Sequence, residues 1–379
     1  MRVRLVVDRP AWEALVDALP RGNILQSYEW GEFKAAFGWQ PLRLVVEREG
    51  RPVAGAQMLL RGCPLGTVAY VPRGPMLDFD DRQATDILLA ALHREARRRG
   101  AFFLKIEPDY PSSDTLAGEL ATRGFRPAAA VQPHSTIVVD LAAEPAVLEG
   151  RLSRRTRYNI RLAERKGLRC VPGGEADVGE FYRLLVETAR RGRFFVHPPE
   201  YYRDLWRRFA PRRMAHLMLV RHGEDALAAT MFFTEGKRAY QFYGGSSLQG
   251  RRLKPNDLLQ WRALLRAREL GCRTYDLWGI PDEVGRLQEE AQSPQQAPHL
   301  YDERAAAGTM RGVYLFKRGF GGAVVRTVGA FDYVYAPVRY WLWTRALPAT
   351  RRLVGLAAAR TGGVERERNG PKPREVYEA

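Results

Sequence analysis

The sequence repeats itself once, at an offset of 170 to 173 residues. Residues 50–60 read G-R-P-V-A-G-A-Q-M-L-L, and residues 223–233 read G-E-D-A-L-A-A-T-M-F-F. The motif Ala-Tyr-x-x-x-Gly then begins at Ala69 and again at Ala239, and a glycine ends a helical segment before a strand-like one in both copies. Because three matches keep the same order at nearly the same offset, the chain is predicted to contain two copies of one structural unit.

Each copy has the same predicted order of strands and helix. In the first copy we expect strands at 43–49, 53–60 and 67–71, a helix at 86–99 and a strand at 101–106. In the second copy we expect strands at 216–220, 226–233 and 239–243, a helix at 257–270 with Asn256 as its N-cap, and a strand at 274–278. A hairpin followed by strand, helix and strand predicts an α/β domain with a mixed sheet.

The chain carries a large excess of positive charge. Its 379 residues include 60 Lys and Arg but 43 Asp and Glu, which gives a net charge of +17 and a pI near 10.1. Residues 147–213, between the two copies, hold 17 basic and 8 acidic side chains. The expected partner is therefore a polyanion: nucleic acid, an anionic lipid surface or a phosphorylated substrate.

Several classes of protein are not indicated by the sequence. An apolar content of 45% and three scattered Cys exclude a disordered chain and a disulfide scaffold. There is no metal-binding His spacing, no P-loop, no G-x-G-x-x-G after a strand and no G-x-S-x-G. The sequence shows neither a signal-peptide apolar region nor a run near the roughly 18 apolar residues of a membrane span. We expect a soluble, cytoplasmic monomer without a metal or cofactor.

An arginine-rich helix is predicted from Ser153, its N-cap, to Gly167. Arg154, Arg157, Arg161 and Arg165 recur at three- and four-residue spacing and form one cationic stripe. Like charges at this spacing destabilise an isolated helix, which favours a bound anion. The expected anion carries phosphate groups, and the alternative is a solvated basic face.

The hairpin, strand and helix of each copy resemble the acetyltransferase fold of the GNAT superfamily. Those enzymes usually bind the coenzyme A pyrophosphate through a Q/R-x-x-G-x-G/A turn before a helix. The corresponding residues 249–255 read Q-G-R-R-L-K-P and lack the spaced glycines. The resemblance implies the fold without that turn, and an N-acyltransferase that uses acyl-CoA or an acyl carrier remains an alternative.

A doubled GNAT-like unit of this kind resembles the FemA/FemB/FemX (FemABX) peptidyltransferases, which build the interpeptide bridges of peptidoglycan. The resemblance covers about residues 20–345 and rests on an ordered set of motifs: Q-S-x-x-W-x-x-x-K at 26–34, S-R-R-T-R-Y-N-I-x-x-A-x-x-x-G at 153–167, Y-G-G-S-S at 243–247, Y-D-L-W-G-I at 275–280 and G-x-Y-x-F-K-R-G-F-G-G at 312–322. The long helical arm with which some members bind tRNA has no counterpart here.

The resemblance implies two tandem GNAT-like domains and an aminoacyltransferase. The domains are expected at 1–148, with a returning segment at 318–345, and at 149–317, followed by a basic tail at 346–379. The implied reaction moves an amino acid from aminoacyl-tRNA to a peptidoglycan precursor, either lipid II or UDP-MurNAc-pentapeptide. A non-catalytic RNA-binding protein is the alternative from another class, although only Tyr158 supplies an aromatic ring within the arginine stripe.

Three residues are expected to act in catalysis. Lys317 lies between Phe316 and a glycine-rich turn that suits close approach to a ligand, and its ammonium is expected to stabilise the tetrahedral intermediate. Glu107 ends a strand and is expected to orient the acceptor amine or accept its proton. Tyr243 ends a central strand and is expected to position the aminoacyl ester. The alternatives are a surface lysine, a plain strand-end carboxylate and a packed tyrosine.

Further residues are expected to bind substrate: Lys34, Arg193, Tyr201, Tyr275, Arg157 and Arg161. Lys34 lies at the edge of a predicted helix whose aromatic residues face a core, where it suits a diphosphate or solvent equally well. Arg193 is chosen for the phosphate-binding arginine that the family has near residues 190–197. Asp276 is expected to hold neighbouring backbone, and Trp278 is expected to lie in a core.

The segment 337–360 mixes aromatic and aliphatic residues with five arginines. Tyr340–Trp343 are expected to dock onto the first domain, as the family's returning segment does. Leu347–Arg360 suit contact with anionic lipid, which implies peripheral association with the inner face of the plasma membrane.

Overall fold

The computed structural model describes residues 1–346 apart from residues 20, 193 and 291–309. The chain divides into unit 1, which contains Met1–Gln132 and the segment from Val328 onward, and unit 2, which is Pro133–Thr327. The first break thus lies before the predicted residue 148, and the return to unit 1 lies after the predicted residue 318. Both differences arise because β8 (Ser135–Asp140) and β14 (Ala323–Arg326) pair with each other in the sheet of unit 2.

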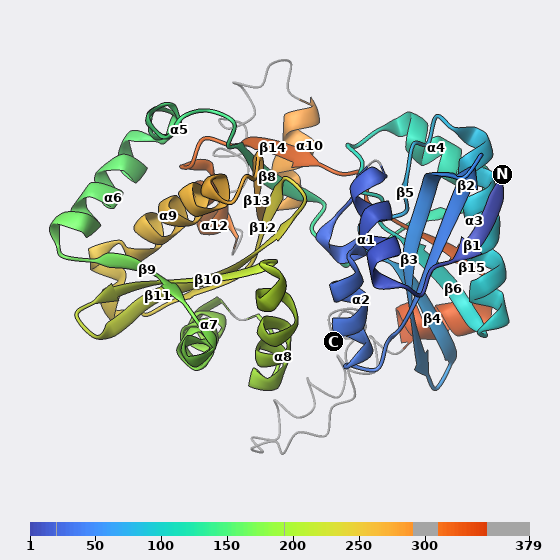
Figure 1. The fold of residues 1–379 in the computed structure, drawn as a ribbon, viewed down its shortest axis with the longest axis horizontal. Helices are drawn as coiled ribbons and strands as arrows, with labels where there is room; N and C mark the ends of the chain where they lie inside the picture. The colour runs from blue at the N-terminus through green and yellow to red at the C-terminus, as the bar shows by residue number, and fades with distance from the viewer. Residues whose placement is uncertain (20, 193, 291–309, 347–379) are drawn as a thin grey trace. The chain divides into compact units, whose positions relative to one another are not determined.

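Unit 1 is a mixed sheet with helices packed on it (Figure 1). Its strands lie in the order β1 (Arg2–Leu5), β2 (Gln40–Arg48), β3 (Arg51–Cys63), β4 (Gly66–Val71), β6 (Ala101–Ile106), β15 (Ala330–Val334) and β7 (Arg126–Ala128), and β5 (Met76–Leu77) pairs with β3. Its main helices are α1 (Arg9–Ala18), α2 (Tyr28–Ala35), α3 (Arg82–Arg98) and α4 (Asp114–Thr122). The apolar face of α3 packs on β2, β3 and β6 and forms the core.

Unit 2 is built in the same way (Figure 1). Its strands lie in the order β14, β8, β13 (Thr274–Ile280), β12 (Arg238–Ser246), β11 (Asp225–Glu235), β10 (Ala215–His222) and β9 (Arg169–Gly173). Its helices are α5 (Pro145–Arg151), α6 (Arg154–Arg165), α7 (Val178–Gly192), α8 (Pro199–Phe209), α9 (Pro255–Glu269), α10 (Asp282–Glu290) and α12 (Arg311–Arg318). The predicted α/β fold of two duplicated copies is confirmed.

The two sheets have the same strand order, with one strand exchanged between the copies. The strands β1, β2, β3, β4 and β6 correspond to β9, β10, β11, β12 and β13. The next strand of unit 1 is β15, from the end of the second copy, and the next strand of unit 2 is β8, from the end of the first copy. Both run antiparallel to their neighbours. Each sheet is therefore completed by a strand that the other copy supplies.

The N-caps predicted for α6 and α9 have different outcomes in the structure. Ser153 caps α6, because its side chain accepts a hydrogen bond from the Thr156 N–H at 3.1 Å, as predicted. Asn256 does not cap α9: the helix begins at Pro255, after Lys254 in the left-handed conformation (φ 61°). The Asn256 side chain instead donates to Ser246 Oγ at 3.1 Å and holds the end of β12.

The C-terminal part of the described chain packs on unit 1, as expected for Tyr340–Trp343. In α13 (Pro337–Trp341) and the turn that follows it, Tyr340 and Trp343 contact Phe103 and Phe102 of β6, with ring centres 5.3 and 5.9 Å apart. Leu347–Arg360 lie outside the described residues. None of the helices in the described part of the chain combines the length and apolarity that a membrane span requires.

Candidate active site

The parallel strands β12 and β13 of unit 2 separate before they end. They pair at three positions, from Arg238 with Thr274 to Tyr240 with Asp276, although β12 continues to Ser246 and β13 to Ile280. Each strand also has a register shift in the separated part, at Phe242 against β11 and between Asp276 and Gly279 against β8. Bulges re-aim side chains and occur often beside active sites, and ligands of open α/β sheets bind at the carboxyl ends of the strands. This region is the candidate active site.

Asp276 shapes the bulge in β13. Its Oδ1 accepts hydrogen bonds from the Trp278 N–H at 2.7 Å and from the Thr136 hydroxyl of β8. Trp278 has a φ of 62°, which is unusual for a residue with a bulky side chain and costs on the order of 1–3 kcal/mol. The prediction that Asp276 holds neighbouring backbone is confirmed. Trp278 is half-buried rather than enclosed in a core, because the bulge turns it out of the strand's regular alternation.

Lys317 of α12 is bound to this bulge. Its Nζ donates hydrogen bonds to the carbonyl oxygens of Trp278 at 3.1 Å and Gly279 at 2.7 Å. Burial lowers the pKa of Lys317 from 10.5 to about 8, and the carboxylate of Asp276 partly opposes this shift. An ammonium has three N–H donors, so one remains for a substrate oxygen. The arrangement provides a desolvated, acidic ammonium whose position the backbone fixes.

Aromatic side chains surround the separated end of β12. The ring centres of Phe242 and Trp278 lie 4.4 Å apart. Those of Tyr243 and Tyr202 of α8 lie 5.2 Å apart, with perpendicular rings. Tyr243 as a whole is half-buried. The sequence analysis missed Phe242 and the two carbonyl oxygens that hold Lys317. A glycine after Trp278 was the available signal, since it marks an irregular strand.

The wall of this region on the side of α7 and α8 contains Tyr201. Tyr201 is buried and stacks on His197, with ring centres 3.9 Å apart. Arg193, the predicted phosphate ligand, lies outside the described residues. The neighbouring Phe194 and Phe195 are exposed, and Phe195 meets the edge of His197 at 5.1 Å. The substrate-binding roles of Tyr201 and Arg193 stay predictions.

The glycines of the Y-G-G-S-S motif and of the glycine-rich turn serve packing inside unit 2. A Cβ atom on Gly245 would lie 2.5 Å from the Leu184 carbonyl, so α7 packs directly on β12. A Cβ atom on Gly321, which has a φ of 77°, would lie 2.6 Å from the Arg151 carbonyl. The backbone of the turn therefore packs closely on α5 of the protein itself, and the expected approach to a ligand at this turn stays a prediction.

Two predicted site residues lie in unit 1. Lys34 is 2% exposed, and its Nζ lies 5.3 and 5.7 Å from the ring centres of Trp30 and Phe33. The expected edge position of Lys34 is wrong, because its long side chain folds back over the two rings. Glu107 is also buried and accepts hydrogen bonds from the Tyr70 hydroxyl and from the N–H groups of Val131 (2.6 Å) and Gln132 (3.2 Å). Glu107 therefore holds the backbone of Val131 and Gln132, where the first part of unit 1 ends.

Tyr275 lies in the core of unit 2 and not at a binding surface. Its side chain is fully buried, its ring lies 5.6 Å from that of Phe232, and burial raises the pKa of its hydroxyl. A substrate contact would require this core to open, so the expected position of Tyr275 at a substrate is wrong. The cause is its place within the paired part of β13, opposite Ala239 and Val139.

The arginine stripe on α6 lies on the surface of unit 2. Arg161 pairs with Glu149 at 2.9 Å, both side chains being well exposed, and Arg157 donates weakly to the Gly150 carbonyl at 3.5 Å. Arg154, Arg155 and Arg165 have no acidic partner within 4 Å among the described residues. Tyr158 is 57% exposed among them. The stripe is thus a cationic surface with one aromatic ring.

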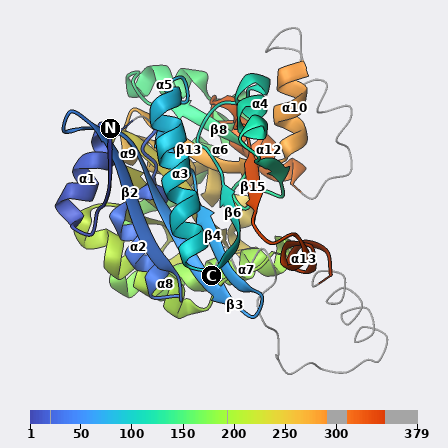
Figure 2. The ribbon, with the colours of Figure 1, turned by 90° about the vertical axis from the view of Figure 1, so that its right-hand side faces the viewer.

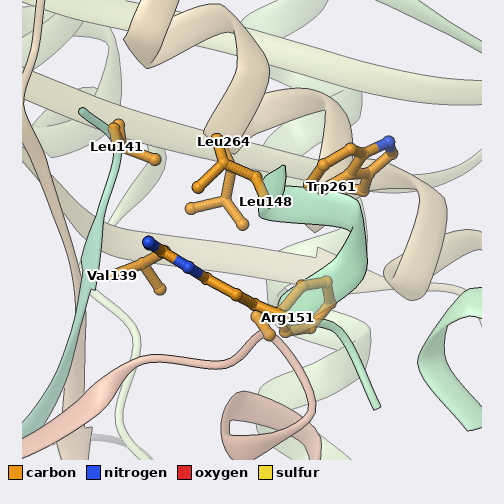
Figure 3. A pocket seen from close by; sticks show the side chains of 7 residues that line it. Val139, Leu141, Leu148, Arg151, Trp261 and Leu264 are labelled. Carbon is orange, nitrogen blue, oxygen red and sulfur yellow. The ribbon is translucent and has the colours of Figure 1, made fainter. Parts of the chain in front are cut away.

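A small gap in unit 2 is not a competing site (Figure 3). It has no room for a water molecule and is lined by Val139, Leu141, Leu148, Arg151, Trp261, Leu264 and Phe320. The Arg151 side chain extends across it, and its Nη1 lies 3.6 Å from Asp140 Oδ2. An apolar lining with one paired guanidinium offers no group for acyl transfer.

Comparisons with known proteins agree with this geometry. Residues 151–284 match an acetyltransferase (GNAT) domain, and residues 10–124 match the FemAB family. A lipid II:glycine glycyltransferase of Staphylococcus saprophyticus is 24% identical over 404 residues, which span 87% of this chain and 92% of the relative.

Solved structures show the same architecture. The crystal structure of FemX has a TM-score of 0.78 at 22% identity and covers 90% of this chain and 99% of its own. A tandem GNAT protein from the clavulanic acid biosynthesis pathway has a TM-score of 0.51 at 16% identity and covers 87% of this chain and 98% of its own. The family models fall on separate copies of the duplication, and the FemX likeness spans both. The chain has a tandem GNAT fold, and its similarity to the FemAB family model, to the lipid II:glycine glycyltransferase and to FemX supports the FemABX family.

Proposed function

We propose that this protein transfers an aminoacyl group to an amine on the stem peptide of a lipid-linked peptidoglycan precursor, in the formation of cell-wall bridges. The relative named lipid II:glycine glycyltransferase supports the acceptor class, because it aligns over most of both chains. The observation that carries the proposal is Lys317: its desolvated ammonium is fixed by two backbone carbonyls at the separated ends of β12 and β13.

The proposed chemistry is aminolysis of an ester. The acceptor amine attacks the carbonyl carbon of the aminoacyl ester, a C–N bond forms, and the carbonyl electron pair moves to oxygen. The third N–H of Lys317 stabilises that oxyanion. Collapse of the intermediate breaks the C–O bond to the donor, and the proton that the amine loses passes to the departing hydroxyl. The Phe242 and Trp278 rings exclude water beside the reacting carbonyl.

The proposed donor is aminoacyl-tRNA. Its phosphates suit the α6 stripe, whose Arg154 and Arg165 have no acidic partner within 4 Å among the described residues. Tyr158 offers a ring on which a base can stack. A coenzyme A donor fits less well at the start of α9, where GNAT enzymes bind pyrophosphate. Pro255 there lacks an N–H, and the Asp257 side chain occupies the first turn, where it accepts from Asn159 Nδ2 at 3.0 Å.

A product-mass experiment tests this proposal. The purified protein is incubated with a mixed aminoacyl-tRNA pool and either lipid II or UDP-MurNAc-pentapeptide, with acetyl-CoA replacing the tRNA pool in a parallel reaction. We expect a mass gain of one amino-acid residue on lipid II with the tRNA pool. A gain with acetyl-CoA alone would identify a conventional N-acetyltransferase, and no gain in any reaction would reject transferase activity on these acceptors.

A further inference from the structure

The segment from α13 to Ala346 has one face fixed to unit 1. Tyr340 and Trp343 pack on β6, and the Tyr340 hydroxyl donates to Asp332 Oδ2 at 2.8 Å. Asp332 is itself buried and lies 2.8 Å from Lys105 Nζ. These contacts join the segment to β6 and β15 within one unit, so its orientation on the surface of unit 1 is set (Figure 2).

The opposite face of the same segment exposes apolar side chains. Val338 is 74% exposed and Trp341 is 58% exposed, and Arg345 continues the stripe one turn later. The spacing of three and then four residues places all three on one side. All eight tryptophans of the chain lie in its described part, and Trp341 is the one that is exposed. An exposed Trp beside an exposed Val on a rigid helix marks a contact surface.

Arginines also lie on the parts of unit 1 that the segment packs against. The Arg126 guanidinium lies 4.3 Å from the centre of the Tyr340 ring, and that of Arg97 lies 5.1 Å from the Tyr335 ring. Arg339 is exposed, and its Nη1 reaches the β3–β4 turn at Gly66. Asp332, the carboxylate bound to Tyr340, is neutralised by Lys105. We call Val338, Trp341, Arg345, Arg339, Arg97 and Arg126 the α13 patch.

We infer that the α13 patch seats unit 1 on an anionic lipid surface. This inference rests on the proposed function in one respect: a lipid-linked acceptor is presented at a membrane. Tryptophan prefers the membrane–water interface, aliphatic side chains enter it, and each nearby arginine is attracted by anionic headgroups. The chain also continues from this patch into residues 347–360, which include Leu, Val, Ala and three Arg.

A lipid surface explains the patch better than RNA does. Val338 is 74% exposed and offers nothing that a phosphate or a base could bind. The α6 stripe of unit 2, by contrast, combines several arginines with a single exposed ring and has no exposed aliphatic residue within the helix. The two basic surfaces therefore differ in the one component that partitions into lipid.

Vesicle co-sedimentation of the full-length protein tests the inference. The vesicles contain phosphatidylcholine with phosphatidylglycerol, without any precursor, so binding does not depend on transferase activity. Val338→Ser with Trp341→Ser is expected to weaken binding about tenfold. The matched control is Leu5→Ser with Val7→Ser, which removes two exposed apolar side chains of unit 1 from β1 and the residues after it. The control is expected to bind like the wild type.

A second measurement locates the contact. Brominated phospholipid quenches tryptophan fluorescence only at the membrane, so wild-type protein is expected to be quenched, whereas Trp341→Phe is expected to bind but lose most of the quenching. Equal vesicle binding by the Ser double variant and the wild type would overturn the inference. The inference would also be overturned if the Ser double variant bound tRNA more weakly than the wild type but bound vesicles equally well. In transfer assays, the Ser double variant is expected to lose activity on vesicle-embedded lipid II. Any wild-type activity on soluble UDP-MurNAc-pentapeptide is expected to be kept by this variant.

Discussion

Unit 1 and unit 2 share one strand order but end their parallel strand pairs in different ways. In unit 1, β4 and β6 remain paired to their last residues, Val71 and Ile106. In unit 2, β12 and β13 separate after Tyr240 and Asp276, and each has a bulge in the separated part. The difference shows that one copy keeps its parallel pair closed, while in the other copy the two strands separate at the candidate active site.

The two copies also carry opposite charges at corresponding positions of β6 and β13. Tyr70 pairs with Lys105 in unit 1, and Tyr240 pairs with Asp276 in unit 2. Lys105 is neutralised within the sheet by Asp332 of β15. Asp276 accepts from Thr136 of β8 and shapes the bulge that receives Lys317 from a helix. In unit 1 the exchanged strand β15 thus supplies the acidic partner of Lys105. In unit 2 the exchanged strand β8 supplies the Thr136 hydroxyl that binds Asp276 at the bulge.

The largest effect is expected from Lys317→Met. Loss of one oxyanion donor typically lowers turnover by roughly 10²–10³, and the methionine side chain keeps most of the packing of α12. Product formation from aminoacyl-tRNA and lipid II, measured together with thermal unfolding, checks this expectation. Lys237→Met removes an exposed lysine of unit 2 and serves as the control. If both variants turn over like the wild type, Lys317 has no part in the reaction.

Glu107→Gln is expected to affect stability and not turnover. The substitution exchanges an acceptor-only carboxylate for an amide, so a donor faces the Val131 and Gln132 N–H groups and the fold loses about 1–3 kcal/mol. Urea unfolding measures this loss, and the turnover of folded protein is expected to stay within about twofold of the wild type. A drop in turnover at unchanged stability would instead assign Glu107 to catalysis.

The closed copy was easier to predict from sequence than the site in the other copy. Strand alternation and helical spacing located the elements of both copies, and Ser153 was found because N-capping is a local signal. The exchange of β8 and β15 depends on pairing between segments about 130 to 230 residues apart, which no local pattern encodes.

Side-chain environments set the limit for the individual site residues. The helical phase placed Lys34 at an edge, but did not show that its side chain is buried beside the rings of Trp30 and Phe33. Tyr275 and Tyr243 both seemed to end a strand, yet Tyr275 lies in the paired part of β13 and Tyr243 in the separated part of β12. The lysine motif at Lys317 was recognisable, whereas its partners depend on the left-handed Trp278, which a sequence pattern does not indicate.

The pH dependence of the reaction is expected to follow Lys317. The pKa of this ammonium is lowered to about 8, so the protonated form predominates below pH 8 and is lost as the pH rises. Its contribution to turnover is therefore nearly complete below about pH 7, is about half at pH 8, and falls about tenfold for each pH unit above about pH 9. The ratio of wild-type turnover to that of Lys317→Arg isolates this effect, because the guanidinium stays charged and the acceptor amine titrates equally in both. A ratio that is constant from pH 7 to 9.5 would contradict the assignment.

The smallest effect is expected at the α6 stripe, as a change in the salt dependence of tRNA binding. Arg157→Ala with Arg161→Ala is expected to reduce the salt dependence of tRNA binding by about two phosphate contacts, measured as log Kd against log salt concentration. The reduction is closer to one if Glu149 already neutralises Arg161, to which it is paired at 2.9 Å. Arg2→Ala with Arg51→Ala removes the same charge from exposed positions of unit 1 and controls for net charge. Equal slopes for the two double variants would make the stripe a solvated surface, and the positive charge of unit 2 would then need another explanation.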